Sequence, residues 1–407
     1  MVYHNLRRNK IKTMKKNLLF ALLILVLPTQ CFTQENFLDT IWSGGIMRTF
    51  RVYVPAMYDA QTPTPLIFNF HGSGGNAVNF ESATKFRSVA DTANFILITP
   101  NGTVDPVYPQ FGQIWNNFTC CSPVDDVLFV SNMIDSLSDI YNIDLARIYS
   151  AGYSNGGFMG YDLACKLSHR IAAVASVAGT MITSRITSCS PSRVVPILEI
   201  HGTLDGNVPF NGGAIDITGD TLASVPAVLT FWANFNQCDA PPPTITNLPN
   251  TNTTDGSSVQ RHIYPNCGDG SAVELLKVVL GGHTWPGLPG GNTNRDIIAD
   301  EEIWHFFSKH NLNGTVGTTD KPKESTWSVF PNPANDLLHV VLPEGTGKTV
   351  IRIMDILGNT VLQQLTSDLA SGQINLDASG LTNGIYFLEI QDGIQKRPAQ
   401  KLLISRQ

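Results

Sequence analysis

A serine lies between two glycines in the segment SAGYSNGGFMG, residues 150 to 160. An apolar run precedes it and a helix-like stretch follows it. Ser154 is therefore predicted on a sharp strand-to-helix turn, with Gly152 and Gly156 as the small flanking residues. A serine hydroxyl placed there can attack as a nucleophile if a neighbouring base takes its proton. The G-x-S-x-G spacing also occurs by chance in a chain with 34 glycines, so a structural turn is the competing interpretation.

Two further residues could supply the base and the acid that such a serine needs. Asp205 follows the apolar run VVPILEIHG, and His283 follows VELLKVVLGG directly. A serine, an acid and a histidine in this order, each after its own strand, form a known catalytic arrangement on parallel sheets. His283 is predicted to accept the serine proton, and Asp205 to orient and support the imidazolium. Asp125 and Asp126 are rival acids, but both stand where a helix is predicted to begin, and acidic residues favour that position as caps.

A glycine-rich loop, NFHGSGGN at residues 69 to 76, follows an early strand. Its glycines leave backbone N–H groups free to face a developing negative charge. We assign this oxyanion hole to the N–H groups of Ser73 and of Asn155, the residue after the nucleophile. Four elements in the correct order favour a catalytic site over a structural turn.

Other aromatic and histidine side chains near these segments have two interpretations each. Trp285 and Trp115 could line a substrate pocket, or they could be buried in the core. His71 and His201 each precede a glycine at a strand end. For both histidines a structural hydrogen bond is favoured over catalysis.

The elements that must position these residues alternate as strand, turn and helix from about residue 50 to residue 310. The apolar runs are nearly continuous rather than alternating, which is typical of strands buried on both faces of a parallel sheet. Residues 123–141 have the apolar spacing and early acids of a helix. We therefore predict an α/β fold, a mostly parallel sheet flanked by helices. Together with the order of Ser154, Asp205 and His283 along the chain, this layout predicts an α/β-hydrolase fold. Strands are predicted at residues 48–55, 65–72, 95–102, 147–152, 172–179, 194–202 and 273–282.

The two ends of the chain differ from this region. Residues 1–34 read as a signal peptide, with Met14 as a possible true start, because a basic opening precedes an apolar run too short to span a bilayer. The main domain is predicted over 35–311 and a polar linker over 312–326. Residues 327–407 contain short strands with turn signals, as in a small β-sandwich.

Composition excludes several classes of partner. The net charge is −6 and charged residues make up 15% of the chain, so there is no basic field for nucleic acid. No stable transmembrane segment is predicted, and no metal or organic cofactor is required by the proposed chemistry. Hydrophobic residues make up 43%, enough for a large core.

The chain has seven cysteines, and removal of a signal peptide containing Cys31 would leave an even number. None of them has the C-x-x-C spacing of a zinc site. Cys238 and Cys267 flank one Pro/Asn/Thr-rich excursion and are the first candidates for a disulfide. A bond between adjacent Cys120 and Cys121 would strain the peptide, so each is expected to bond elsewhere. The six disulfide candidates are Cys120, Cys121, Cys165, Cys189, Cys238 and Cys267.

The motifs together resemble the secreted poly(3-hydroxybutyrate) depolymerase and feruloyl esterase family of α/β hydrolases. The matching segments cover most of residues 40–310 and are HGSGG, CCSPVDDVLFV, IYSAGYSNGGFMGYDLAC, IHGTLDGNVPFNGG and GGHTWPG. The resemblance implies carboxylic ester hydrolysis by Ser154, Asp205 and His283. It also implies that the adjacent cysteines bond to partners such as Cys165 and Cys189. Many relatives have cysteine where this chain has Ser73, but the backbone N–H survives that change.

The C-terminal segments FPNPANDLLHV, VIRIMDILGNTV, LTNGIYFLEI and KLLISR resemble the sorting domain of type IX secretion substrates. This resemblance implies export by the type IX machinery, followed by secretion or attachment at the cell surface. A carbohydrate-binding module is the alternative for this β-sandwich, but its aromatic residues are too few for an obvious sugar-stacking platform.

These observations predict a secreted serine esterase that forms an acyl-enzyme, acting on feruloyl or acetyl esters of plant polysaccharide. The alternative substrate is poly(3-hydroxybutyrate) or another polyester. A serine peptidase of the prolyl-oligopeptidase type and a non-catalytic surface binding protein are the remaining interpretations.

Overall fold

The structure of the chain is a computed structural model with two compact units, Met1–Val316 and Gly317–Gln407. The predicted signal peptide, apart from Gln34, and most of the predicted linker lie outside the described residues. The described residues are 34–117, 124–214, 220–239, 242–290, 292–315, 328–332, 334–341, 349–355, 359–366, 373–392, 395–396 and 400–406.

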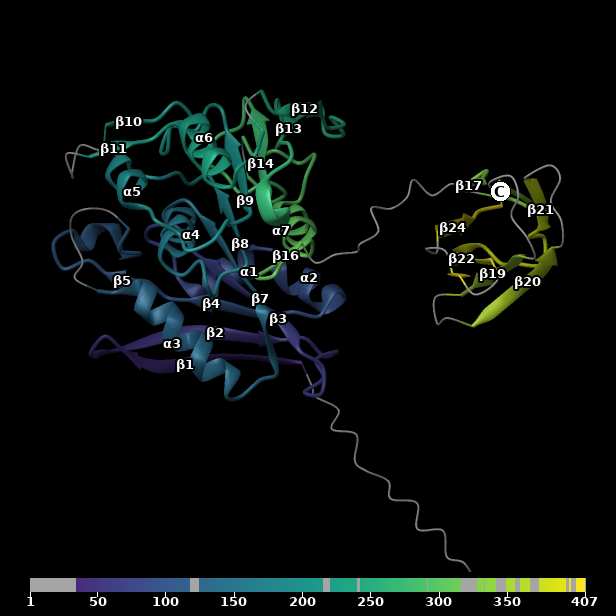
Figure 1. Ribbon diagram of the computed structural model, residues 1–407, viewed down its shortest axis with the longest axis horizontal. Helices are drawn as coiled ribbons and strands as arrows, with labels where there is room; N and C mark the ends of the chain where they lie inside the picture. Colours follow the sequence, from purple (N-terminus) through teal and green to yellow (C-terminus); the bar gives the residue numbers. More distant parts are fainter. Residues whose placement is uncertain are drawn as a thin grey trace, which may run out of the picture. The chain divides into compact units, whose positions relative to one another are not determined.

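The first unit is built on one large sheet (Figure 1). Within the described residues this sheet has ten strands, and the six from β4 to β14 along its order run parallel. Antiparallel strands complete both edges. In spatial order the strands are β1 (Glu35–Ser43), β2 (Ile46–Val54), β4 (Ile96–Pro100), β3 (Thr64–Phe70), β7 (Ile143–Tyr153), β8 (Ala173–Val177), β9 (Ile197–Gly202), β14 (Val273–Val279), β13 (Ser258–Tyr264) and β12 (Thr244–Asn247).

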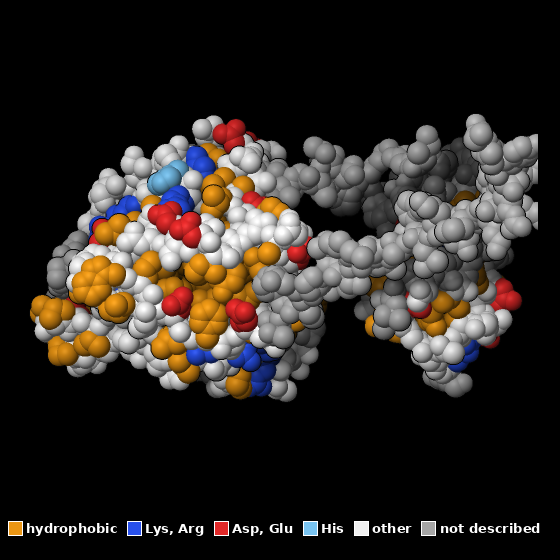
Figure 2. Space-filling model, turned by 90° about the horizontal axis from the view of Figure 1, so that it is seen from below, with side chains coloured by type: hydrophobic (Ala, Val, Ile, Leu, Met, Phe, Trp, Pro, Cys, Tyr) orange, Lys and Arg blue, Asp and Glu red, His pale blue; other side chains and the backbone are white. Residues whose placement is uncertain are grey.

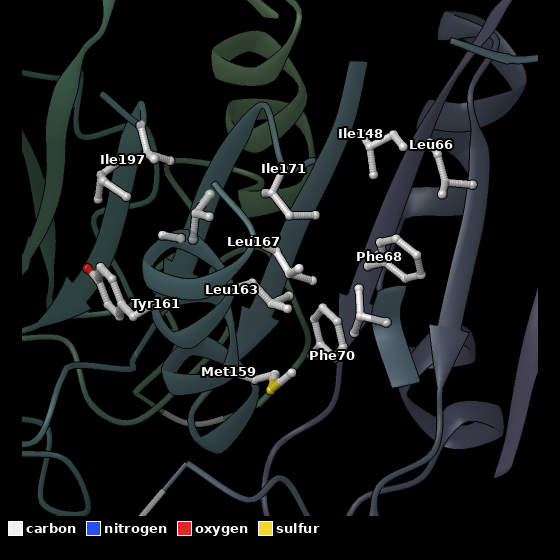
Figure 3. Packing of buried hydrophobic residues seen from close by; sticks show 14 of the residues in the cluster. Leu66, Phe68, Phe70, Ile148, Met159, Tyr161, Leu163, Leu167, Ile171 and Ile197 are labelled. Atoms are coloured by element: carbon white, nitrogen blue, oxygen red, sulfur yellow. The ribbon is translucent and has the colours of Figure 1, made fainter. Parts of the chain in front are cut away.

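Helices cover both faces of the sheet, and each face has its own hydrophobic core. One core joins the sheet to α3, α4 and α6, and Figure 3 shows Met159 and Leu163 of α4 lying toward Phe70 of β3. The other core joins it to α2 and α7. The helices are α1 (Ala77–Ala83), α2 (Phe86–Ala93), α3 (Asp126–Ser138), α4 (Asn155–Lys166), α5 (Thr183–Ser188), α6 (Val225–Phe235) and α7 (Ala299–Phe307).

Burial on both faces explains the continuous apolar runs in the sequence. All seven residues of β3 are buried, with Phe68 in one core and Ile67 in the other. The α/β-hydrolase fold predicted from these runs is confirmed, and each of the seven predicted strands is present. The edge strands β1 and β12, and β13 beside β12, were not predicted, because their sequences alternate or are largely polar and exposed.

Short elements lie in the connections and at the end of this unit. The β15–β16 pair continues the unit beyond residue 311, where the main domain was predicted to end. The short elements are β5 (Thr103–Val104), η1 (Pro109–Phe111), β6 (Gln113–Ile114), β10 (Gly213–Ala214), β11 (Thr221–Leu222), η2 (Gly268–Gly270), β15 (His310–Asn311) and β16 (Gly314–Thr315).

The surface of the first unit mixes apolar and charged side chains (Figure 2). Several large apolar side chains of the β1–β2 hairpin are exposed, among them Trp42 at 64% and Met47 at 57%. Among the described residues there is no helix long and apolar enough to cross a membrane.

The second unit consists of two antiparallel sheets around a separate apolar core. Leu338 and Leu376 come from the first sheet, and Ile353 and Leu388 from the second. This arrangement fits the predicted β-sandwich. Its strands are β17 (Ser328–Phe330), β18 (Leu337–Val341), β19 (Thr349–Met354), β20 (Thr360–Thr366), β21 (Gln373–Asp377), β22 (Gly384–Asp392), β23 (Gln395–Lys396) and β24 (Gln400–Ile404).

Two disulfides lie within the described residues of the first unit. Cys238 bonds to Cys267, which confirms the pair predicted from the sequence. Cys165 bonds to Cys189, so the expectation that the adjacent cysteines bond to these two is wrong. The ends of α4 and α5 bring the two Cα atoms to 5.0 Å, within the normal span of a disulfide. Cys120 and Cys121 lie outside the described residues.

Candidate active site

Ser154 occupies the sharp turn between β7 and α4. Its backbone has φ 53° and ψ −120°, a conformation that disfavours any residue with a Cβ. The turn brings strand and helix so close that a Cβ on Gly152 would lie 2.1 Å from the Gly156 carbonyl oxygen. A Cβ on Gly156 would lie 2.2 Å from the carbonyl oxygen of Phe70. The two glycines predicted to flank the nucleophile are therefore required by close backbone approach.

Ser154, His283 and Asp205 form a continuous hydrogen-bonded chain. The Ser154 Oγ lies 2.9 Å from His283 Nε2, and His283 Nδ1 lies 2.7 Å from Asp205 Oδ2. A carboxylate can only accept, so the imidazole must carry its proton on Nδ1. The Nε2 lone pair then faces the serine hydroxyl. The three residues lie far apart in sequence but meet at the carboxyl ends of their strands, as the strand order predicted.

Backbone and side-chain donors hold Asp205 in place. Its Oδ1 accepts hydrogen bonds from the backbone N–H groups of Asn207 and Val208, at 2.9 and 2.8 Å. Burial alone would raise the pKa of this carboxyl. The hydrogen bonds from His283 and Val208 outweigh burial and hold the pKa of Asp205 below its usual value. The acid therefore stays ionised where it faces the imidazole.

Two residues that line the pocket with Ser154 could offer it a backbone N–H. They are Asn155, at the first position of α4, and Ser73, in the glycine-rich loop after β3. Neither N–H donates to an acceptor within the parts of the chain that the structure describes. Their N–H groups are available to an oxygen that becomes negatively charged beside the serine.

The Asn155 side chain fixes the position of its own backbone. Its Oδ1 accepts from the Trp115 N–H at 2.7 Å, and its Nδ2 donates to Asn117 Oδ1 at 2.9 Å. Asn117 in turn donates to the Asn155 carbonyl at 2.8 Å. Asn155 is only 2% exposed, so these bonds are made away from water. Trp115 and Asn117 thus hold the start of α4 in place through these hydrogen bonds.

The His71 side chain fixes the backbone of the glycine-rich loop in a similar way. Its Nε2 accepts from the Gly102 N–H at 3.0 Å, so Nδ1 carries the proton and donates to the Gly72 carbonyl at 2.7 Å. The Trp115 indole donates to the His71 carbonyl at 2.8 Å. Burial lowers the pKa of His71 to about 4, so the ring stays neutral. The structural role predicted for His71 agrees with these bonds.

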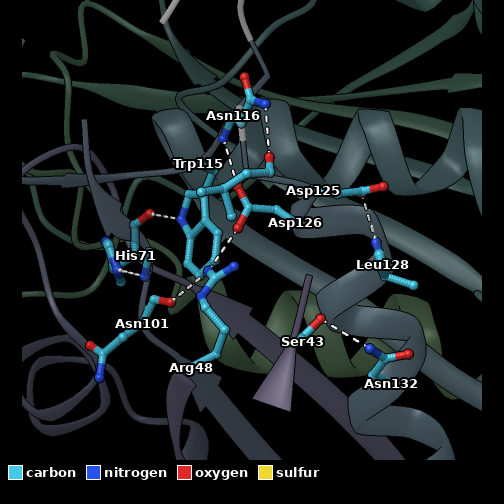
Figure 4. A network of polar contacts seen from close by, with 12 residues as sticks. Ser43, Arg48, His71, Asn101, Trp115, Asn116, Asp125, Asp126, Leu128 and Asn132 are labelled. Carbon is cyan, nitrogen blue, oxygen red and sulfur yellow. Dashed lines mark hydrogen bonds and ion pairs between the residues drawn. The ribbon is translucent and has the colours of Figure 1, made fainter. Parts of the chain in front are cut away.

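A buried ion pair lies behind these contacts (Figure 4). Arg48 Nη2 lies 2.7 Å from Asp126 Oδ1, and both side chains are almost fully buried. Asp126 also accepts from the Asn116 N–H at 2.7 Å, and Arg48 donates to the Asn101 carbonyl at 3.1 Å. Asp125 is the N-cap of α3 and accepts from the Leu128 N–H. Neither rival acid reaches His283, and both have structural roles.

The pocket in front of Ser154 has a volume of about 540 Å³. Its walls are mainly apolar, and Gly72, Ser73 and Asn207 add polar atoms near the serine. The expected tryptophans do not line it. Trp115 is 0% exposed behind the glycine-rich loop, and Trp285 is 3% exposed with its indole donating to Asp300 at 2.9 Å. The apolar lining comes from Phe111, Tyr153, Phe158, Val208 and Leu222.

Several residues of the site were not predicted from the sequence. The Tyr153 hydroxyl donates to the His283 carbonyl at 2.8 Å, and its ring lies beside the imidazole. Burial raises the pKa of Tyr153 to about 12, so the hydroxyl keeps its proton. Its place directly before Ser154 was the one available signal. Asn117 and Phe111 carried no signal, because both lie in connections without a recognisable motif.

The fold and the Ser–His–Asp geometry define the class as α/β hydrolase. A family model described as phospholipase/carboxylesterase matches residues 56–215, and one described as secretion system C-terminal sorting domain matches residues 328–405.

Three curated proteins show similarity to the first unit. Feruloyl esterase B of Piromyces equi is 32% identical over 237 residues, 57% of this chain and 42% of that protein. A bifunctional acetylxylan esterase/xylanase of Neocallimastix patriciarum is 24% identical over 71% of this chain and 37% of that protein. The chain therefore spans about two-fifths of the length of these two relatives.

Probable feruloyl esterase C of Aspergillus oryzae is 32% identical over 265 residues, which cover 64% of this chain and 83% of that protein. The chain belongs to the carboxylesterase family of α/β hydrolases that includes these feruloyl esterases, and it carries a C-terminal secretion sorting domain. The sorting domain marks it for secretion or display at the cell surface.

Proposed function

We propose that this protein is a serine carboxylic ester hydrolase that acts on feruloyl or acetyl esters of plant polysaccharide. The observation that carries the proposal is the hydrogen-bonded chain from Ser154 through His283 to Asp205, open to a largely apolar pocket. Metal chemistry has no role in this proposal.

The geometry supports a two-step mechanism. His283 Nε2 removes the hydroxyl proton as Ser154 Oγ attacks the ester carbonyl, and Asp205 stabilises the imidazolium that forms. The N–H groups of Ser73 and Asn155 bind the oxygen of the tetrahedral intermediate. His283 then protonates the leaving alcohol, and an acyl-enzyme remains on Ser154. Water activated by the same imidazole hydrolyses it.

The pocket favours an aromatic acyl group over a bare acetyl group. Pockets of about 300–1,000 Å³ enclose ligands of drug size. A volume near 540 Å³ therefore exceeds the need of an acetyl group. Phe111, Tyr153 and Phe158 offer aromatic surface on which a cinnamoyl ring can pack. Asn207 lies at the same pocket and can hydrogen-bond a ring substituent or a sugar hydroxyl.

The substrate is tested by comparing hydrolysis of methyl ferulate, acetylated xylan and a 3-hydroxybutyrate oligomer. We expect the highest kcat/KM on methyl ferulate. Preference for the oligomer would replace plant esters with a polyester as substrate. Cleavage of chromogenic peptides with no cleavage of p-nitrophenyl esters would instead make the protein a peptidase.

Replacement of the nucleophile is the sharpest test of the serine mechanism. Ser154→Ala should lower kcat on p-nitrophenyl acetate by about 10⁶-fold, because His283 and Asp205 have no function without the hydroxyl. The variant should also lose labelling by a fluorophosphonate probe. Ester hydrolysis at more than about a hundredth of the wild-type rate would contradict the assignment.

The second unit is proposed to be the signal recognised by the type IX secretion machinery. Its match to a secretion sorting domain over residues 328–405 supports this role. A chain ending before residue 328 should stay in the periplasm of the native host. Fractionation followed by immunoblotting against the first unit measures this.

A further inference from the structure

A second carboxylate and a second imidazole lie behind Asp205. Glu199 and His201 are two residues apart on β9, so their side chains project from the same face of the sheet. Both side chains are at most 1% exposed. His201 Nδ1 lies 2.9 Å from Glu199 Oε1, and His201 Nε2 lies 2.8 Å from the Val208 carbonyl oxygen. The same Nε2 lies 3.4 Å from Asp205 Oδ2, the oxygen that accepts from His283.

This arrangement determines the number of protons on the pair. Val208 offers a carbonyl oxygen and Asp205 a carboxylate oxygen, so His201 Nε2 must carry a proton to avoid facing two acceptors with a lone pair. His201 Nδ1 and Glu199 Oε1 must then share one further proton. It resides on Nδ1 as an imidazolium–carboxylate pair or on Oε1 as a neutral pair. In both forms the Nε2–H points at Asp205 and Val208.

The surroundings of the pair favour this proton count. The Tyr161 hydroxyl of α4 donates to Glu199 Oε2 at 2.7 Å, and Figure 3 shows Tyr161 pointing away from the Leu163 side of the helix, toward β9. Lys277 of β14 is the register neighbour of His201, and both contact the ring of Phe210. Burial lowers the pKa of His201, but the hydrogen bond and charge of Glu199 outweigh burial and hold that pKa above its usual value.

We propose that the buried Glu199–His201 pair positions Asp205, acting as an outer layer of the Ser–His–Asp arrangement. This inference rests on the proposed function. The Nε2–H of His201 ties the Val208 carbonyl and Asp205 Oδ2 to β9, while the Val208 N–H binds Asp205 Oδ1. The carboxylate is thereby held from both sides and its negative charge is partly compensated. Glu199 and His201 touch no reacting atom and are positioning residues.

His201→Phe separates this role from simple packing. The phenyl ring fills the space of the imidazole but offers no N–H to Asp205 or to the Val208 carbonyl. We expect kcat on p-nitrophenyl acetate to fall about 10- to 100-fold with KM within about twofold, as when outer hydrogen-bond partners of other active-site groups are removed. In Glu199→Gln the amide N–H₂ can donate to His201 Nδ1, so Nε2 keeps its proton and this variant should retain most of the activity that His201→Phe loses.

Glu81→Gln is the matched control. Glu81 on α1 is an equally buried glutamate, paired with Arg51 and Arg87 and outside the site. Its replacement should lower the melting temperature and leave kcat unchanged. His201→Phe with wild-type kcat would overturn the proposal, and Glu199→Gln with a loss as large as that of His201→Phe would overturn the proton count on which it rests.

Two further measurements keep the proposal testable. If His201→Phe fails to fold, the smaller His201→Leu decides by the same measurement, and an unchanged kcat overturns the proposal. If the wild type hydrolyses no ester, the proposed function fails. The rate at which a fluorophosphonate labels Ser154 then still measures the positioning, and it must be slower in His201→Phe than in the wild type.

Discussion

Ser154 and Asp205 meet at His283, but the chain holds them by different means. The serine is placed by the backbone, on a turn that requires glycine at positions 152 and 156. The acid is placed by hydrogen bonds with two backbone N–H groups and with His283, and His201 Nε2 lies 3.4 Å from its Oδ2. A steric requirement is local in sequence, whereas a hydrogen-bond network draws on several elements. The position of Ser154 therefore depends on close packing of the backbone. The position of Asp205 depends on the number and placement of the protons around it.

Loss of Asp205 should affect catalysis far more than loss of the rival acid Asp125. In Asp205→Asn the amide N–H₂ faces His283 Nδ1, which favours the tautomer with its proton on Nε2 and removes the base from Ser154. We expect kcat to fall about 10⁴-fold. Asp125→Ala removes only the cap of α3 and should cost about 1 kcal/mol of stability with normal kcat. Steady-state kinetics and urea unfolding of both variants check this, and a reversed outcome would identify the wrong acid.

An added methyl group should lower the free energy of unfolding much more beside Ser154 than beside Asp205. Gly156→Ala places a Cβ against the Phe70 carbonyl, so the free energy of unfolding should fall by about 4 kcal/mol. Gly206→Ala, next to Asp205, meets no atom within 4 Å and should change it by less than about 0.5 kcal/mol. Urea unfolding measures both. Equal effects would remove the contrast between a steric and a hydrogen-bonded half.

Low pH should lower the free energy of unfolding through protonation of His71, which holds the glycine-rich loop beside Ser154. The folded-state pKa is about 4, below the ordinary value of 6.5, so the unfolded chain binds the extra proton first as the pH falls. The contribution is complete above pH 6.5 and is lost between there and about pH 4, for a total of about 3 kcal/mol. His71→Gln, which cannot titrate, should show a shallower decline in unfolding free energy over this range. An identical slope in both proteins would show that His71 does not titrate as described.

The last prediction is a small gain in the free energy of unfolding. Ser154→Gly relieves the positive φ at the turn and should raise the free energy of unfolding by about 1 kcal/mol, while Ser154→Ala keeps the strain. The comparison is made by urea unfolding of the two inactive variants. A glycine variant no more stable than the alanine variant would mean that the turn is not strained.

The nucleophile side could be read from the sequence because its requirements lie within a few residues. Gly152, Ser154 and Gly156 form one motif that indicates a strand, a turn and a helix. The continuous apolar runs indicate the strands of a buried sheet. The order of Asp205 and His283 along the chain was sufficient to predict their meeting. The edge strands were missed because their pattern follows exposure rather than burial.

The supporting residues could not be predicted, for a physical reason. Glu199 and His201 look like part of an apolar strand, and their function depends on Tyr161 and Val208, which reach them from other elements. Trp115 was a candidate for the pocket, with burial in the core as the alternative, because an aromatic residue near a site fits either place. Its indole is instead needed to satisfy the His71 carbonyl. Partners of this kind emerge only when the elements are packed together.

The disulfide between Cys165 and Cys189 has a consequence for when the protein matures. It links the far end of α4 to the end of α5, and the first turn of α4 carries Asn155, the proposed oxyanion donor. Such a link contributes about 3 kcal/mol and forms only in an oxidising compartment. A chain still in the reducing cytoplasm lacks this bond and the one between Cys238 and Cys267. The hydrolase therefore reaches its full stability only after it has left the cytoplasm, in agreement with its secretion sorting domain.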